Sequence, residues 1–158
     1  MAFVKEVTLV LKSTIENIED GVVDHALDEI SEITVSGFMK PTEDGFFLTY
    51  SEDGEGGRTV SDVTVSTDTV RVRRVGSVKS DMLFKVGTVH TSIYEVVPYR
   101  FDMSVEATKI RNTLSLGAGM LDLFYKMKVG GAEKKVRLRI SVFPLQSREN
   151  AAASAAQV

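Results

Sequence analysis

The chain has 158 residues, a formal net charge of −3 at pH 7 and no cysteine. A chain of this length is expected to fold as one domain with its own core, and the lack of cysteine excludes disulfides, thiolate metal sites and cysteine nucleophiles. The acidic balance argues against a nucleic-acid partner. No apolar run approaches the ~20 residues of a membrane helix, so we expect a cytoplasmic protein that does not associate with membranes.

The first forty residues predict two strands joined by a loop. Apolar side chains at every second position are typical of a half-buried strand. The alternating residues are Val7, Leu9 and Leu11 in the first strand, and Ile33, Val35 and Gly37 in the second. Residues 16–30 lie between them, are acidic and lack a clear period. They therefore predict a loop that runs into the second strand.

Four short strands are expected between residues 45 and 87, separated by turns rich in Gly and Asp. Their alternating faces are Phe46, Leu48 and Tyr50, then Ser61, Val63 and Val65, then Val70, Val72 and Arg74, and finally Met82, Phe84 and Val86. The short, regular spacing of these runs favours antiparallel strands that follow one another directly.

The remaining strands are predicted between residues 89 and 143. One of them carries Val89, Thr91 and Ile93 on one face and His90, Ser92 and Tyr94 on the other. The next strand changes parity near Ala107 and Lys109, which predicts a β-bulge or a break in the strand. Residues 119–143 predict a hairpin, because the Gly130-Gly131 pair supplies the positive φ angles that a tight turn requires.

Nine or ten short strands joined by tight turns predict an all-β protein. The meander-like connections favour an antiparallel up-and-down β-barrel, since closure removes exposed sheet edges. We expect the barrel domain to cover residues 1–145. Residues 146–158 are rich in alanine but have no apolar face, so we expect a disordered tail.

Several segments, taken in order, resemble a known family. They are residues 45–52 (GFFLTYSE), residues 72–76 with 82–87, Tyr94-Glu95 before Pro98-Tyr99, and residues 121–125 with 136–140. Their order over residues 3–143 resembles the YwiB-like group of uncharacterised bacterial proteins. The resemblance implies a lipocalin-like (calycin-type) barrel of about eight strands and carries no established activity. Val96-Val97 and Arg100 depart from the threonine and glycine usual in that group, so no site at this turn follows from the resemblance.

The sequence contains no recognisable catalytic motif. The two histidines, His25 and His90, lie far apart and form no metal-binding H-E-x-x-H motif, and we expect neither a metal nor a cofactor. Glycines at residues 54–56 and 117–119 lack the third glycine of a dinucleotide loop and predict hairpin turns. Glu52, Asp53 and Glu55 do not have EF-hand spacing, and we expect a solvated acidic turn.

Arg74 is the residue that stands out by parity, because it shares a face with Val70 and Val72. A guanidinium that enters a barrel needs a partner for its charge. The structural interpretation is an ion pair with Asp or Glu, or a position at the rim with the head in water. The functional interpretation is that Arg74 anchors an acidic group of a ligand in the mouth of the barrel.

Other polar and aromatic residues allow similar alternatives. His90 and Tyr94 belong to a polar stripe, which is most often the solvated face of a sheet, although an inward stripe would line a cavity. Tyr50 is expected in the core or in a pocket wall. The outward cations of two strands would form a basic face if those strands were neighbours, and solvated charge is the simpler interpretation. These cations are Arg71, Arg73, Lys135, Arg137 and Arg139.

Three functions remain compatible with this pattern. The first is a barrel that binds a small apolar or acidic molecule in its interior, with Arg74, Tyr50, His90 and Tyr94 as contacts. The second is a filled barrel that acts as a protein interaction module or a homodimer. The third is an enzyme with a site near His90, which would need Tyr94 and a carboxylate in the same cleft and is the least favoured.

Overall fold

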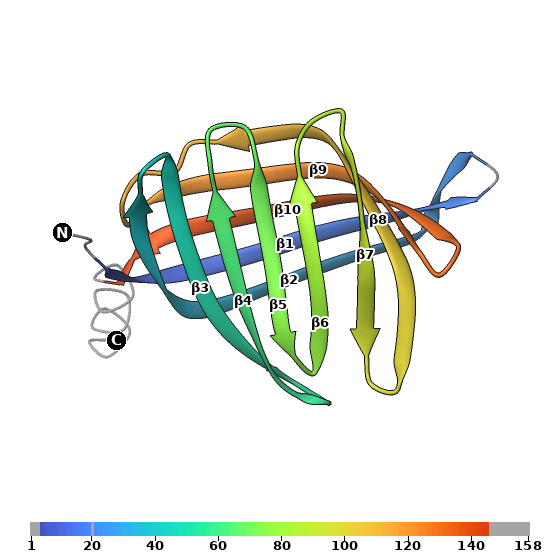
Figure 1. Ribbon diagram of the computed structural model, residues 1–158, viewed down its shortest axis with the longest axis horizontal. Coiled ribbons are helices and arrows are strands. Elements are labelled where there is room, and N and C mark those ends of the chain that lie inside the picture. The colour runs from blue at the N-terminus through green and yellow to red at the C-terminus, as the bar shows by residue number, and fades with distance from the viewer. Residues whose placement is uncertain (1–3, 20, 146–158) are drawn as a thin grey trace, which may run out of the picture.

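The fold is a closed antiparallel barrel of ten strands in which every strand pairs with its neighbours in sequence and β1 closes on β10 (Figure 1). The computed structural model describes residues 4–19 and 21–145, and the backbone alone for residues 22–28. The strands are β1 (Lys5–Glu19), β2 (Val22–Thr42), β3 (Gly45–Gly54), β4 (Gly57–Val65), β5 (Val70–Gly76), β6 (Val78–Phe84), β7 (Val89–Val96), β8 (Tyr99–Asn112), β9 (Gly119–Val129) and β10 (Ala132–Pro144). The predicted all-β, up-and-down barrel is confirmed, with the strand number at the upper end of the expected range. Within the described part of the chain, no helix is long and apolar enough to cross a membrane.

Two groups of strands cross each other to form the barrel. Figure 1 shows β1, β2, β9 and β10 along the long axis, with β3 to β7 running across them. β8 pairs with β7 in its first half and with β9 in its second, and its register shifts between Ala107 and Lys109. The predicted bulge is therefore confirmed, and it lies where β8 bends from one group of strands into the other.

The core is built from the inward side chains of the strands, although β7 and the described residues of β2 before Gly37 contribute no fully buried side chain. Leu9, Leu48 and Phe84 are fully enclosed, and each such side chain contributes roughly 1.5–3 kcal/mol of burial free energy. The other fully buried large side chains are Val7, Met39, Val63, Val65, Val70, Val105, Leu121, Leu123 and Ile140. The alternation predicted from the sequence thus places the core correctly.

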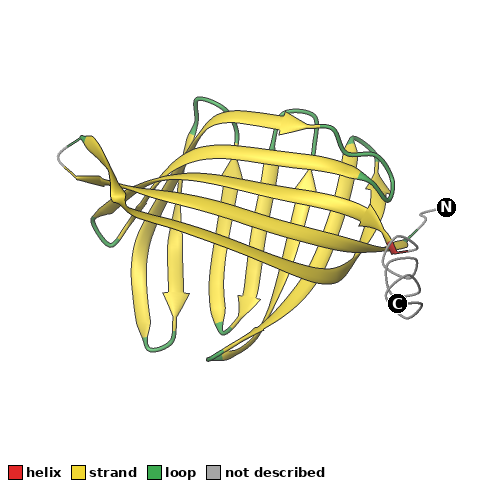
Figure 2. Ribbon diagram, turned by 180° about the vertical axis from the view of Figure 1, so that it is seen from behind, coloured by secondary structure: helices red, strands yellow, loops and turns green. Residues whose placement is uncertain are grey.

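The loop predicted for residues 16–30 is wrong. Strand β1 continues to Glu19, β2 begins at Val22, and Glu19 pairs with Val22. Figure 2 shows the tip of this hairpin projecting beyond the barrel. Residues 13–18 of β1 are half-buried at every position, so this part of the strand has no buried face that would produce alternation between apolar and polar residues. The tail expected from residue 146 lies outside the described residues.

Candidate binding site in the barrel

The wall of the barrel divides between β2 and β3. These strands pair from Gly37 and Tyr50 to Thr42 and Gly45. Before Gly37, β2 pairs with β1, and after Tyr50, β3 pairs with β4, so the two strands no longer share a ladder among the described residues. Gly37 suits this point of divergence, because a Cβ atom there would lie 2.5 Å from the carbonyl oxygen of Thr49.

Residues on both sides of this division line an interior cavity of about 270 Å³, here called the inner cavity. Its wall combines apolar side chains with polar groups from several strands. The apolar lining consists of Leu11, Ile15, Ile33, Met82, Met127, Val136 and Leu138, and the polar lining of Ser13, Ser31, Tyr50, Glu52, Arg74 and Tyr125. An apolar wall with a small number of polar groups is the usual composition of a small-molecule site.

Arg74 is the charged centre of a polar row that crosses four adjacent strands. Tyr50 is in register with Ser61, Ser61 with Arg74, and Arg74 with Ser80. Because these positions share one face of the sheet, all four side chains point inward. The structure therefore places Arg74 on the inner face, at the edge of the barrel, where its side chain is 27% exposed.

Glu52 partly neutralises Arg74. The Nη2 atom of Arg74 donates a hydrogen bond to Oε1 of Glu52 over 3.3 Å, and the Glu52 side chain is 31% exposed. Arg74 thus has a carboxylate partner at the edge of the barrel, and both side chains of the pair remain partly open to solvent. A guanidinium has five N–H donors, and among the described residues the side chain of Arg74 uses one, so the others remain able to contact a ligand.

Two buried tyrosines complete the polar part of the inner cavity. Burial raises the pKa of Tyr50, although the positive charge of Arg74 opposes that rise. Burial also raises the pKa of Tyr125, again against the charge of Arg74. The ring of Tyr125 packs on Phe84 with 4.6 Å between the ring centroids. Both phenols are therefore protonated at neutral pH and can donate hydrogen bonds to an oxygen atom of a ligand.

His90 and Tyr94 do not line the inner cavity. Their stripe is half-buried, while Val89 and Ile93 on the other face are exposed, so the preferred interpretation of a solvated stripe is wrong. This stripe lies where β6 and β7 separate. In the described chain the two strands pair only through Val78–Val96 and Lys79–Glu95. Beyond that point, Nδ1 of His90 accepts a hydrogen bond from the backbone N–H of Leu83 over 3.3 Å and links the separating strands.

Glu52 and Tyr125 are site residues that the sequence pattern does not single out. The pattern predicts a solvated acidic turn around Glu52, yet this residue lies inside the mouth beside Arg74, while Asp53 pairs with Arg58 outside. Parity could have identified Glu52, because it lies two residues after the inward Tyr50. Parity could likewise have identified Tyr125, which follows the inward Leu121 and Leu123. No group of three or more His, Asp or Glu side chains among the described residues is arranged to hold a metal ion.

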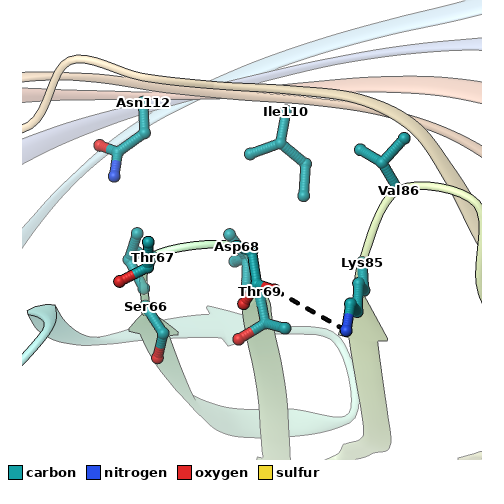
Figure 3. A pocket seen from close by; sticks show the side chains of 10 residues that line it. Ser66, Thr67, Asp68, Thr69, Lys85, Val86, Ile110 and Asn112 are labelled. Carbon is teal, nitrogen blue, oxygen red and sulfur yellow. Dashed lines mark ion pairs between the residues drawn. The ribbon is translucent and has the colours of Figure 1, made fainter.

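A second cavity lies at the opposite end of the barrel and is less suited to a ligand. It has a volume of about 290 Å³ and lies between the β4–β5 turn, the end of β6 and β8 (Figure 3). Its charged groups, Lys85 and Asp68, form an ion pair of 3.7 Å, and both side chains are more than half exposed. Exposed pairs of this kind contribute little free energy, so the inner cavity remains the better candidate.

Comparison with known proteins supports the fold and assigns a family. Residues 14–140 match a family described as a domain of unknown function, DUF1934. The chain is 27% identical over 128 residues to the uncharacterised β-barrel protein YwiB of Bacillus subtilis (strain 168), a match that covers 81% of this chain and 85% of the relative. The crystal structure of the ywiB protein from Bacillus subtilis superposes with a TM-score of 0.72 and 25% identity, over 87% of this chain and 92% of that chain. The residues that match the family include nine of the ten strands in full or in large part together with most residues that line the inner cavity, and the chain therefore belongs to the DUF1934 family.

Proposed function

We propose that this barrel binds a compact small molecule with an apolar body and an acidic or otherwise oxygen-rich head in the inner cavity. The observation that carries the proposal is the convergence of Arg74 and two protonated tyrosines, Tyr50 and Tyr125, on one apolar cavity. Three groups of hydrogen-bond donors facing the same space match an acceptor such as a carboxylate.

The size of the cavity limits the ligand. Ligand pockets commonly measure about 300–1,000 Å³, and the inner cavity, at about 270 Å³, lies at the small end. This is the space of roughly nine water molecules at about 30 Å³ each. A medium-chain organic acid such as octanoate fits this space, whereas a ligand as large as a sterol does not.

Glu52 provides a route for an anionic head to enter. It is bound to Arg74 through one hydrogen bond and is itself partly open to solvent. A carboxylate that reaches Arg74 would replace Glu52 as the partner, and Glu52 would turn toward water. Because this exchange conserves the ion pair, the cost of burying the ligand's charge is offset by the guanidinium that is already in place.

The proposal is tested by displacing the fluorescent dye 8-anilinonaphthalene-1-sulfonate with octanoate and with octanol. These two competitors share an apolar chain and differ in the charge of the head. We expect octanoate to bind more tightly than octanol to the wild-type protein, and Arg74→Gln to weaken octanoate about tenfold while leaving octanol unchanged, since a charge-assisted hydrogen bond contributes about 1.5–3 kcal/mol.

Two further variants make this test specific. Arg58→Gln removes an exposed arginine outside the cavity, and we expect it to change neither competitor. Leu138→Trp enlarges an apolar side chain of the wall, and we expect it to weaken both. Equal binding of octanoate to the wild-type and Arg74→Gln proteins, together with a native mass spectrum of the purified protein that shows no retained small molecule, would overturn the proposal.

A second candidate function is self-association through the end of the β7–β8 hairpin. Val97, Tyr99 and Phe101 are exposed there, Val97 is 76% exposed, and the rings of Tyr99 and Phe101 stack. Large exposed apolar side chains that lie together mark interaction sites. We expect a dimer in sedimentation at micromolar concentration, and we expect Tyr99→Ser to shift it to monomer; a wild-type protein that sediments as a monomer throughout this range would exclude this function.

A further inference from the structure

The outer face of β1, β10, β9 and β8 carries a concentrated group of cations. Two rows of paired residues cross these four strands. The first row is Lys12, Arg139, Asp122 and Arg111, and the second is Thr14, Arg137, Phe124 and Lys109. The five cations of these rows are accompanied by a single carboxylate, that of Asp122. A basic face made jointly by the β5 and β10 cations would require these strands to be neighbours, and they are not, because β5 pairs with β4 and β6.

Asp122 fixes the arginines of this face. Its side chain is 1% exposed, and it accepts two hydrogen bonds from Arg139, at 3.0 Å from Nε and 3.2 Å from Nη2. The Nε atom of Arg137 lies 3.5 Å from the same carboxylate but forms no hydrogen bond and is itself buried. A buried carboxylate that holds two guanidinium groups leaves one positive charge uncompensated at this point and positions both groups in advance.

Two recesses adjoin at Arg137. The smaller, of about 90 Å³, is lined by Lys12, Thr14, Arg137 and Arg139, which supply three cations and one hydroxyl. The larger, of about 550 Å³, extends over Phe124 and includes Lys109 and Lys135, with Glu16 also in its lining. The guanidinium carbon of Arg137 lies 4.9 Å from the centroid of the Phe124 ring, so a planar cation is stacked on an aromatic surface between the two recesses.

The acidic net charge of the whole chain conceals this basic surface. Residues 13–39 contain seven Asp and Glu residues and no Lys or Arg. The rest of the chain therefore carries 19 Lys and Arg against the remaining 15 Asp and Glu of the 22 in total. The acidic segment forms the β1–β2 hairpin (Figure 2), and the barrel outside it is net basic. The average charge is thus not an argument against an anionic partner.

We propose that this face binds a nucleotide unit, with its phosphate in the small recess and its base over the Arg137–Phe124 stack. Three cations and a hydroxyl around a space of a few water volumes match a phosphate group. Arginine planes and aromatic rings are the surfaces on which bases stack. The nucleotide unit comes either from a free nucleotide or from single-stranded RNA, and the two sources share this chemistry. The site lies on the outside of the barrel and does not depend on the inner cavity.

The test measures binding of fluorescein-labelled oligouridylate by anisotropy at about 50 mM salt, and of uridine monophosphate by calorimetry. We expect Lys12→Gln and Arg137→Gln each to weaken binding about tenfold. For the oligonucleotide, each removed cation should also reduce the slope of log affinity against log salt by about one. Binding of both probes at one site indicates a free nucleotide, and binding of the oligonucleotide alone indicates RNA.

Arg71→Gln is the matched control. Arg71 forms a bidentate pair with Asp81 on the outer face of β5 and β6, away from the proposed site, and we expect this variant to bind as the wild type does. Lys12 forms no ion pair with a described residue, so its loss should not disturb folding. The proposal is overturned if neither probe binds the wild-type protein, if Arg71→Gln weakens binding as much as Arg137→Gln, or if polyphosphate of equal charge binds as tightly as oligouridylate.

Discussion

Asp122 shows how one residue can hold together a surface that is otherwise rich in like charge. Burial alone would raise the pKa of this carboxyl group, but the hydrogen bonds and positive charge of Arg139, together with the nearby positive charge of Arg137, outweigh burial and lower the pKa below its ordinary value. Asp122 is therefore ionised at neutral pH although its side chain is almost fully enclosed. Asp122 points to the outer face of β9. The cations that cover it, and not the core, therefore shield its carboxylate from water.

Replacing Asp122 with asparagine should destabilise the protein. The Asp122→Asn substitution keeps the shape of the side chain but leaves Arg139 and Arg137 without their carboxylate. We expect the free energy of unfolding at pH 7 to fall by about 1–3 kcal/mol, measured by urea denaturation. Asp68→Asn, which removes an exposed carboxylate paired with Lys85 at 3.7 Å, is the control and should change the free energy by less than about 0.5 kcal/mol.

The effect of Asp122→Asn should depend on pH in a defined direction. Because the folded-state pKa is lowered, the carboxylate contributes stability above its unfolded-state pKa of about 4, and this contribution is lost as the pH falls through the folded-state value. The difference between wild type and variant should therefore be largest at neutral pH and should decrease below about pH 4. A difference that stays constant down to pH 2 would show that the charge of Asp122 is not its cause.

At the scale of the element, the β9–β10 hairpin is the easiest part of the fold to predict, and the β1–β2 hairpin is the hardest. In β9 and β10, one face packs on the core and the other is charged, so the period of two is visible in the sequence. In β1, residues 13–18 have no such difference between their faces, because all of them are half-buried. The strands of the β1–β2 hairpin are defined by backbone pairing between residues such as Asn17 and Asp24. Backbone pairing alone does not produce a hydrophobic pattern in the sequence.

The β9–β10 turn provides a prediction at this scale. Gly131 has a φ angle of +87°, and a Cβ atom added to it would meet no other atom within 4 Å, so strain and not crowding would limit a substitution. We expect Gly131→Val to lower the free energy of unfolding by about 1–2 kcal/mol, because a β-branched residue is disfavoured at positive φ. Gly131→Asn should cost less, since asparagine tolerates this region. If thermal unfolding showed the two variants to be equally stable, the positive φ angle of Gly131 would not be what this turn requires.

At the scale of the whole molecule, charge is divided between regions that an average cannot reveal. The acidic β1–β2 hairpin and the basic outer face of β8, β9, β10 and β1 share strand β1, and the net charge of −3 averages over both regions. Closure of the barrel also decides which polar residues face inward. It brings Glu52 to Arg74, 22 positions later in the chain, and it turns His90 toward β6 and away from solvent.

The sequence by itself determined the strand positions outside residues 16–30, the bulge in β8, the Gly130-Gly131 turn and the face that Arg74 shares with Val70 and Val72, because side-chain alternation is a local property of each strand. The tertiary structure alone decided that β1 meets β10, that β2 leaves β3 after Gly37, and that Arg74, Tyr50 and Tyr125 share one cavity while His90 and Tyr94 do not. The physical reason is register. Which residues face each other across strands distant in sequence depends on pairing between backbones, and the side-chain pattern of a single strand does not contain that information.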